Sequence, residues 1–206
     1  MNKKVLIALK TFTWVACLFP VGWLVYGAVT NTLGPDATAA ITFTTGKTTL
    51  WLLTISLAIT PLRKLVPQLS WLIKFRRLLG LFAFFYGSLH LLTYVGLYAG
   101  FDVSTMVEDV TKRRFILAGV AAWALMLPLA ATSTNWAIRK LGGKRWSALH
   151  KLVYLAAVAG VVHYWWGVKP GVRTPLLVTV VLLVLFAARP VIGWWQNRKK
   201  AMSANS

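Results

Sequence analysis

The chain has 206 residues, of which 58% are hydrophobic and only 13% charged, and its formal net charge at pH 7 is +19. A soluble domain of this size could not hide so much apolar surface from water, so the composition points to the membrane. Cys17 is the only cysteine, which excludes a disulfide framework, a thiolate metal cluster and covalent haem attachment through a Cys-x-x-Cys-His motif.

Six apolar windows, each near the length that crosses a bilayer as a helix, follow one another along the chain. They cover residues 12–29, 48–65, 78–98, 115–131, 149–166 and 175–195. Lipid leaves backbone polar groups no partner but the chain itself, and the windows lack period-2 alternation, so they predict helices and not barrel strands. We therefore expect an all-α integral membrane bundle of six transmembrane helices, forming a single domain over residues 1–206.

The first window follows the sequence MNKK and resembles a secretory signal peptide at its start. Lys10 interrupts the early apolar run, the later apolar stretch is long, and Pro20 lies inside it. These features favour an uncleaved first transmembrane helix.

Charged residues alternate between the loops. Residues 1–10, 61–77, 132–147 and the C-terminal tail carry sixteen Lys and Arg side chains and no acid. The intervening loops hold all four acidic residues and fewer cations: Asp36, Asp102, Glu108 and Asp109, with Lys47, Lys112, Arg113, Arg114, Lys169 and Arg173. The positive-inside rule then predicts that both termini are cytoplasmic. Because the basic excess orients helices and meets anionic lipid, we expect the bilayer and no nucleic acid as its partner.

The third and fifth windows hold the three histidines of the chain, His90, His150 and His163. A polar ring at membrane depth is costly and is usually retained for a pathway or a ligand, with structural packing as the alternative. Both windows run outward. At 1.5 Å per residue, His90 lies about 20 Å beyond the basic start of its window, and His163 about 20 Å beyond His150. His90 and His163 thus share the outer depth, as bis-histidine ligation of one haem iron requires.

The inner position is less regular, because His150 has no histidine at its depth in the third window. Arg76 precedes His90 by fourteen residues and shares its helix face, which makes Arg76 a candidate contact of an inner haem. Arg76 equally fits a cytoplasmic anchor with Lys74 and Arg77. On an ideal helix His150 and His163 would point about 140° apart, so their spacing alone does not establish a common haem face.

Aromatic side chains crowd the same windows. Those around His90 are candidates to pack on a porphyrin: Phe82, Phe84, Phe85, Tyr86 and Tyr94. Those at residues 164–166 and 194–195 fit an interfacial aromatic belt better.

Three motifs on these windows give the chain a recognisable pattern: RRLLGL at 76–81 before YGSLH at 86–90, KRWSALHKLVY at 144–154, and VHY at 162–164. Over nearly its whole length the chain resembles the ferric reductase-like transmembrane haem proteins. The resemblance implies His90, His150 and His163 as ligands of haem iron, with Arg76 near the inner site, and one or two haems of the b type. The chain differs from NADPH oxidases, which add a cytoplasmic flavin and nicotinamide domain and a fourth histidine, and it has no Gly-x-Gly-x-x-Gly fingerprint.

The resemblance also implies a role. The chain would be the non-catalytic, haem-binding membrane subunit of a bacterial system that repairs methionine sulfoxide in periplasmic proteins. In the inner membrane it would pass electrons from the quinone pool or a cytoplasmic flavin reductase to a periplasmic molybdopterin enzyme. The family also carries FMN, for which the resemblance assigns no residues.

Two redox centres are expected, because one haem covers only part of about 30 Å of hydrocarbon. The inner centre, near His150, is either a second haem or FMN with its phosphate on the basic cytoplasmic loops. Two other functions remain open: a carrier of haem or a small solute with transiently binding histidines, and a scaffold with structural histidines. The absence of acids from every window disfavours proton-coupled transport.

Overall fold

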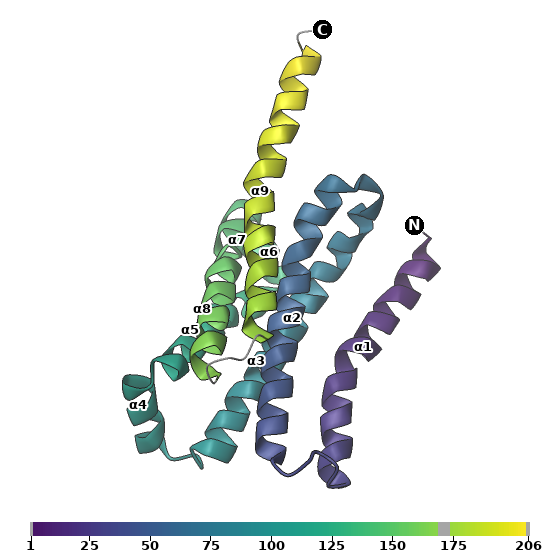
Figure 1. Cartoon of the computed structure of the whole chain (residues 1–206). Helices are drawn as coiled ribbons and strands as arrows, with labels where there is room; N and C mark the ends of the chain where they lie inside the picture. The colour runs from purple at the N-terminus through teal and green to yellow at the C-terminus, as the bar shows by residue number, and fades with distance from the viewer. Residues whose placement is uncertain (1, 169–173, 205–206) are drawn as a thin grey trace.

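A computed structural model describes residues 2–168 and 174–204, and this part of the chain is helical with no strand (Figure 1). The long helices are α1 (Lys3–Val29), α2 (Ala37–Leu65), α3 (Ile73–Thr93), α5 (Arg114–Ala131), α8 (Leu152–Gly167) and α9 (Thr174–Ala204). Shorter elements join them: the 3₁₀ turn η1 (Pro67–Leu72), the π-helical turn η2 (Tyr94–Tyr98), α4 (Val103–Lys112), α6 (Asn135–Leu141) and α7 (Gly143–Leu149). Three of the predicted loops therefore contain short helices. Lys169 and Arg173 lie outside the described residues.

Four predicted windows fall on single long helices, the third continues from α3 into η2, and the fifth begins at the break between α7 and α8. Five segments are long and apolar enough to cross a membrane. They are Lys3–Val29, Pro67–Tyr98, Arg114–Ala131, Gly143–Gly167 and Thr174–Arg198. The second window, on α2, is not among them. The structure thus supports a multi-pass membrane protein with five apolar spans, and α2 as a sixth stays a prediction.

Helix α2 is less apolar because it lies among other helices. It packs against α1, α3, α8 and α9, and it buries Thr45, Thr54 and Ser56. The Thr45 hydroxyl donates to the Ile41 carbonyl at 2.8 Å, and the Thr54 hydroxyl donates to the Leu50 carbonyl at 2.7 Å. Polar side chains satisfied in this way suit a helix that faces protein more than lipid.

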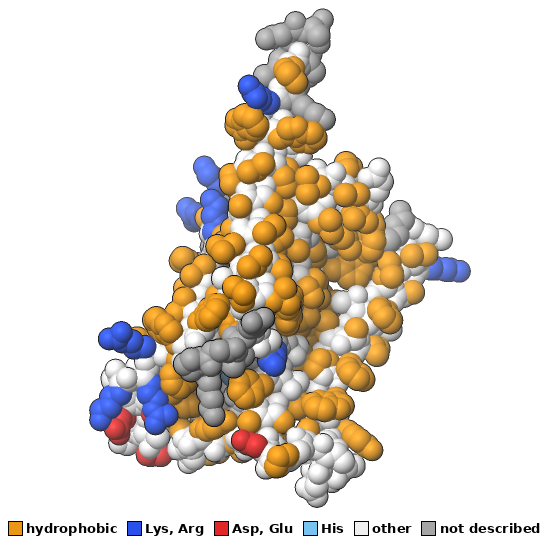
Figure 2. Space-filling model, viewed as in Figure 1, with side chains coloured by type: hydrophobic (Ala, Val, Ile, Leu, Met, Phe, Trp, Pro, Cys, Tyr) orange, Lys and Arg blue, Asp and Glu red, His pale blue; other side chains and the backbone are white. Residues whose placement is uncertain are grey.

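The basic segments of the chain gather at one end of the bundle. The N-terminus of α1, the α2–α3 turn, α6, α7 and the C-terminal end of α9 lie at the upper end in Figure 1, and α4 and the α1–α2 link lie at the lower end. Acidic side chains visible in Figure 2 are confined to the lower end, and hydrophobic side chains cover most of the face between. The fold therefore preserves the alternation of charge seen in the sequence.

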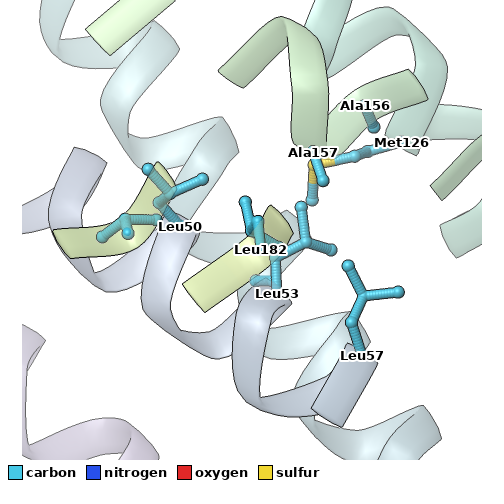
Figure 3. Packing of buried hydrophobic residues seen from close by; sticks show 9 residues of the cluster. Leu50, Leu53, Leu57, Met126, Ala156, Ala157 and Leu182 are labelled. Carbon is cyan, nitrogen blue, oxygen red and sulfur yellow. The ribbon is translucent and has the colours of Figure 1, made fainter. Parts of the chain in front are cut away.

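Two hydrophobic clusters hold the helices together. The larger joins α2, α3, α5, α8 and α9 and contains Leu50, Leu53, Leu57, Ala83, Met126, Ala156, Ala157, Val178 and Leu182 (Figure 3). Its alanines are almost fully buried, which lets the helices approach closely. The smaller joins α1 to α2 and α3 and contains Cys17, Ile59, Phe75, Leu79, Phe82 and Tyr86.

Helix α1 is attached to the bundle at its proline. The Tyr86 hydroxyl donates to the Cys17 carbonyl at 2.6 Å and accepts from the Val21 amide at 3.1 Å, beside Pro20. The hydroxyl thus stands between two backbone groups that would pair with each other in an uninterrupted helix.

Candidate functional site

His90 on α3 and His163 on α8 face each other. Their ring centroids are 5.7 Å apart, and their planes are inclined at 80°. The structure therefore brings together the two residues that the depth argument pairs.

Backbone carbonyls hold one nitrogen of each ring. The Nδ1 atom of His90 lies 3.0 Å from the Thr42 carbonyl oxygen, and that of His163 lies 2.7 Å from the Phe115 carbonyl oxygen. A carbonyl only accepts hydrogen bonds, so Nδ1 carries a proton in both rings, and Nε2 is the nitrogen that can offer a lone pair to a metal. This is the tautomer in which metal-binding histidines are usually held.

Glycines make room for both rings. A Cβ atom added at Gly119 would lie 2.7 Å from His163 Nδ1, and one added at Gly46 would lie 3.0 Å from His90 Cε1. Sequence reasoning missed both glycines, since neither stands in a motif. Their only signal is a small residue within an apolar window, a feature that ordinary helix packing also produces.

A cavity of about 490 Å³ opens beside the two histidines, between α2, α3, α5 and α8. Its walls are mainly apolar, and further glycines, Gly87 and Gly160, also line it. The volume falls within the usual range of ligand pockets. A partly open, mainly apolar space with two fixed imidazoles on its wall fits a flat apolar ring with a central metal, so these residues fit a haem.

The aromatic side chains near His90 divide between this cavity and the α1 interface. Tyr94 lines the cavity, and Phe84 stacks on Trp123, another lining residue, with centroids 5.9 Å apart. Phe82 and Tyr86 belong instead to the cluster that packs against α1. The expectation that these two pack on a porphyrin is therefore wrong, because they occupy the other side of α3.

Helix α4 closes the outer end of the cavity. The Tyr94 hydroxyl donates to Asp109 at 3.0 Å, and Arg113 Nε forms an ion pair with the same carboxylate at 2.9 Å. Tyr94, Asp109 and Arg113 all line the cavity. One buried carboxylate thus ties the start of η2, which continues α3, to the residues just before α5.

His150 lies away from this cavity, at the junction of α7 and α8. The chain turns at His150 and Lys151, so the segment is not one straight helix. The ideal-helix angle of about 140° between His150 and His163 does not apply across such a break. His150 Nδ1 lies 3.0 Å from the Trp146 carbonyl oxygen, and its ring stacks on Trp146 with centroids 3.8 Å apart. Its Nε2 atom is buried and has no hydrogen-bond partner among the described residues.

Arg76 is less exposed to solvent than its basic neighbours. Lys74 and Arg77 are exposed, and Arg77 donates to Asn135 at 2.7 Å. Arg76 is half-buried, donates to the Thr60 hydroxyl at 3.3 Å and interacts electrostatically with His150. Arg76 thus points into the bundle, whereas its neighbours fit the surface anchor.

Comparison with known proteins agrees with this geometry. A family model described as ferric reductase like transmembrane component matches residues 44–161, from α2 into α8. Three relatives are each named protein-methionine-sulfoxide reductase heme-binding subunit MsrQ. The protein from Herminiimonas arsenicoxydans is 45% identical over 95% of this chain and 89% of its own length. The chain belongs to the MsrQ family of ferric reductase-like transmembrane proteins.

The other two MsrQ relatives match over a similarly large share of both chains. The protein from Ralstonia nicotianae is 44% identical over 93% of this chain and 88% of its own length, and that from Rhodospirillum rubrum is 47% identical over 86% and 85%. No solved structure matches the chain. The family model includes His90 and His150 and ends two residues before His163.

Proposed function

We propose that this chain is the electron-transfer membrane subunit of a protein-methionine-sulfoxide reductase. It takes electrons from the quinone pool or a cytoplasmic flavin reductase and delivers them across the bacterial inner membrane to MsrP, a periplasmic molybdopterin enzyme. The chain is itself non-catalytic. One observation carries the proposal: two histidines with fixed Nδ1 atoms face each other beside an apolar cavity of about 490 Å³. The names of the relatives support the reductase.

The proposed topology has six spans in a single domain, with α2 as the second span and both termini cytoplasmic. Helix α2 has 29 residues and is about 43 Å long, enough to cross the hydrocarbon. The gathering of basic segments at one end of the bundle supports the orientation (Figure 1).

His90 and His163 are the proposed axial ligands of a b-type haem in the outer half of the membrane. A haem held there supplies a reversible one-electron centre inside the bilayer. The chain contributes the two Nε2 lone pairs, the carbonyls that hold the ring tautomers, and the glycines that admit a flat ligand. Rings held this rigidly support a resident cofactor more than a transiently bound cargo.

His150 is the proposed ligand of the inner redox centre, with Arg76 beside it. The unpartnered Nε2 atom of His150 supports a ligand at this end of the bundle. That centre is either a second haem or FMN.

The visible spectrum of the purified protein tests the proposal. His90→Ala and His163→Ala should each abolish the same b-type component, because either change removes one axial ligand of the same iron. His150→Ala is the matched control and should leave that component in place. A colourless wild-type preparation from haem-replete cells, or loss of the component in only one of the two outer variants, would contradict the proposal.

A further inference from the structure

Three arginines from three helices meet at the inner end of the bundle. They are Arg63 on α2, Arg76 on α3 and Arg189 on α9, and each is half-buried. Arg76 donates to the Thr60 hydroxyl and Arg189 donates to the Leu57 carbonyl, so both reach α2 within six residues of Arg63. Arg76 also feels the charges of Arg63 and Arg189, and its own charge acts on His150. Arg76 is therefore the centre of a cationic cluster beside the inner histidine.

No carboxylate neutralises this cluster within the described residues. The two ion pairs among the described residues both involve α4, at the opposite end of the bundle. Asp36, the acid on the same helix as Arg63, caps the other end of α2, about 40 Å away at 1.5 Å per residue. Three guanidinium groups thus share one region without a counter-charge.

Neutral groups hold Arg189 in place. Its Nη1 donates to the Tyr154 hydroxyl at 2.5 Å, its Nη2 donates to the Leu57 carbonyl at 2.7 Å, and its guanidinium carbon lies 4.9 Å from the Tyr154 ring centroid. These contacts orient the guanidinium but do not neutralise it.

Three buried polar atoms at this end lack hydrogen-bond partners. They are Arg63 Nε, Arg189 Nε and His150 Nε2, and no other buried side-chain nitrogen or oxygen of the described residues is left unpaired. Burying a donor or a charge without a partner is unfavourable, so such groups are usually satisfied by a ligand or by one another. Here they do not satisfy one another: the two Arg Nε atoms are both donors, and neither is paired with His150 Nε2.

We propose that Arg63, Arg76 and Arg189 form an anion-binding site that holds the acidic group of the inner redox cofactor beside His150. The inference rests on the proposed function. The guanidinium fork matches a carboxylate or a phosphate, so the acidic group is a haem propionate or the phosphate of a flavin mononucleotide. Arg189 is oriented by its two Nη hydrogen bonds, and the Nε atoms of Arg63 and Arg189 are the buried donors left free for the anion.

The test uses the full-length Arg63→Gln variant in zwitterionic nanodiscs, depleted of cofactor and then titrated with four probes. The probes are haem, haem dimethyl ester, which has no free carboxylate, FMN, and riboflavin, which has no phosphate. Binding at the inner site should weaken about tenfold or more, the equivalent of one charge-assisted hydrogen bond. Weakening for haem but not its ester identifies a propionate, and weakening for FMN but not riboflavin identifies a phosphate.

Arg77→Gln is the matched control, because Arg77 is basic, exposed and paired with Asn135. It should leave the binding of all four probes unchanged. Unaltered binding of all four probes in Arg63→Gln, with the outer component retained, would overturn the anion site and leave the proposed function standing. Absence of the His90 and His163 component from the wild type would instead overturn the proposed function.

Discussion

The two ends of this bundle, outer and inner in the proposed topology, place histidine in opposite surroundings. At the outer end, His90 and His163 stand on continuous helices and face each other beside a mainly apolar cavity. At the inner end, His150 stands at a break between helices, beside a cluster of arginines. A matched pair of imidazole rings suits a metal at the centre of a flat apolar ligand, whereas one ring among cations suits a ligand with an acidic edge.

The hydrophobic core separates these two sites. Leu50, Leu53, Met126 and Ala156 belong to the larger cluster and also line the outer cavity. Leu57, one turn further along α2, offers its carbonyl to Arg189 at the inner end. The packed layer therefore lies between the two sites and contributes different residues to each. Variants at one site can be tested separately from variants at the other.

The largest expected effect in this comparison is at Gly119, on the outer side. Gly119→Val places a branched side chain where even a Cβ atom would lie 2.7 Å from His163 Nδ1. The ring must move, so we expect loss of the outer b-type component and a destabilisation of about 3 kcal/mol. The absorption spectrum and thermal unfolding in detergent measure the two effects.

Gly22→Val is the matched control, because nothing lies within 4 Å of a Cβ atom added there. It should keep the spectrum intact. A Gly119→Val protein with the wild-type spectrum would show that the position of the His163 ring does not control the outer site.

An intermediate effect is a difference in stability between variants of two arginines at the inner end. Arg189→Leu leaves the Tyr154 hydroxyl and the Leu57 carbonyl without their partner, so we expect it to destabilise the cofactor-free protein by about 2 kcal/mol. Arg63→Leu removes an Nε atom that has no partner and relieves repulsion with Arg76, so unfolding should be unchanged or slightly later. Thermal unfolding of both variants checks this, and an equal loss of stability would place Arg63 in the framework of the fold.

The smallest expected effect is on pH dependence and belongs to the outer end. Hydrogen bonds from the Thr105 hydroxyl, the Thr105 amide and the Ser104 amide hold the pKa of Asp102, the N-cap of α4, below its usual value of 3.8. A lowered folded-state pKa means that the cap stabilises α4 above the unfolded pKa and stops doing so as pH falls through the folded one. Amide hydrogen exchange in α4 should therefore accelerate on acidification.

Asp102→Asn removes the titrating group and should flatten this acid response in α4. The inner arginine cluster contains no acid and should show no matching change in exchange. If exchange accelerated on acidification to a similar degree at both ends, the proposed difference in charge between the two ends would be contradicted.

The sequence predicts most reliably those features that depend on one segment alone, such as hydropathy and axial rise. The apolar windows lie on helices because hydropathy along a segment reports directly on whether it can lie in lipid. The pairing of His90 with His163 followed from axial rise alone, since rise depends only on residue number along a regular helix. The threonines and basic residues of α2 lower its hydropathy, whereas its packing against α1, α3, α8 and α9 is a property of its neighbours.

The order of the residues is enough to predict a basic, multi-helix membrane chain with a histidine pair at one depth. The packing of the helices is needed to see that Gly46 and Gly119 stand opposite the rings and that the carbonyls of Thr42 and Phe115 hold their tautomers. The packing also brings Arg63 and Arg189, which the sequence shows only as basic residues, to Arg76 and His150. The reason is physical: depth and polarity are properties of one segment, whereas a binding site requires helices far apart in the sequence to pack side by side.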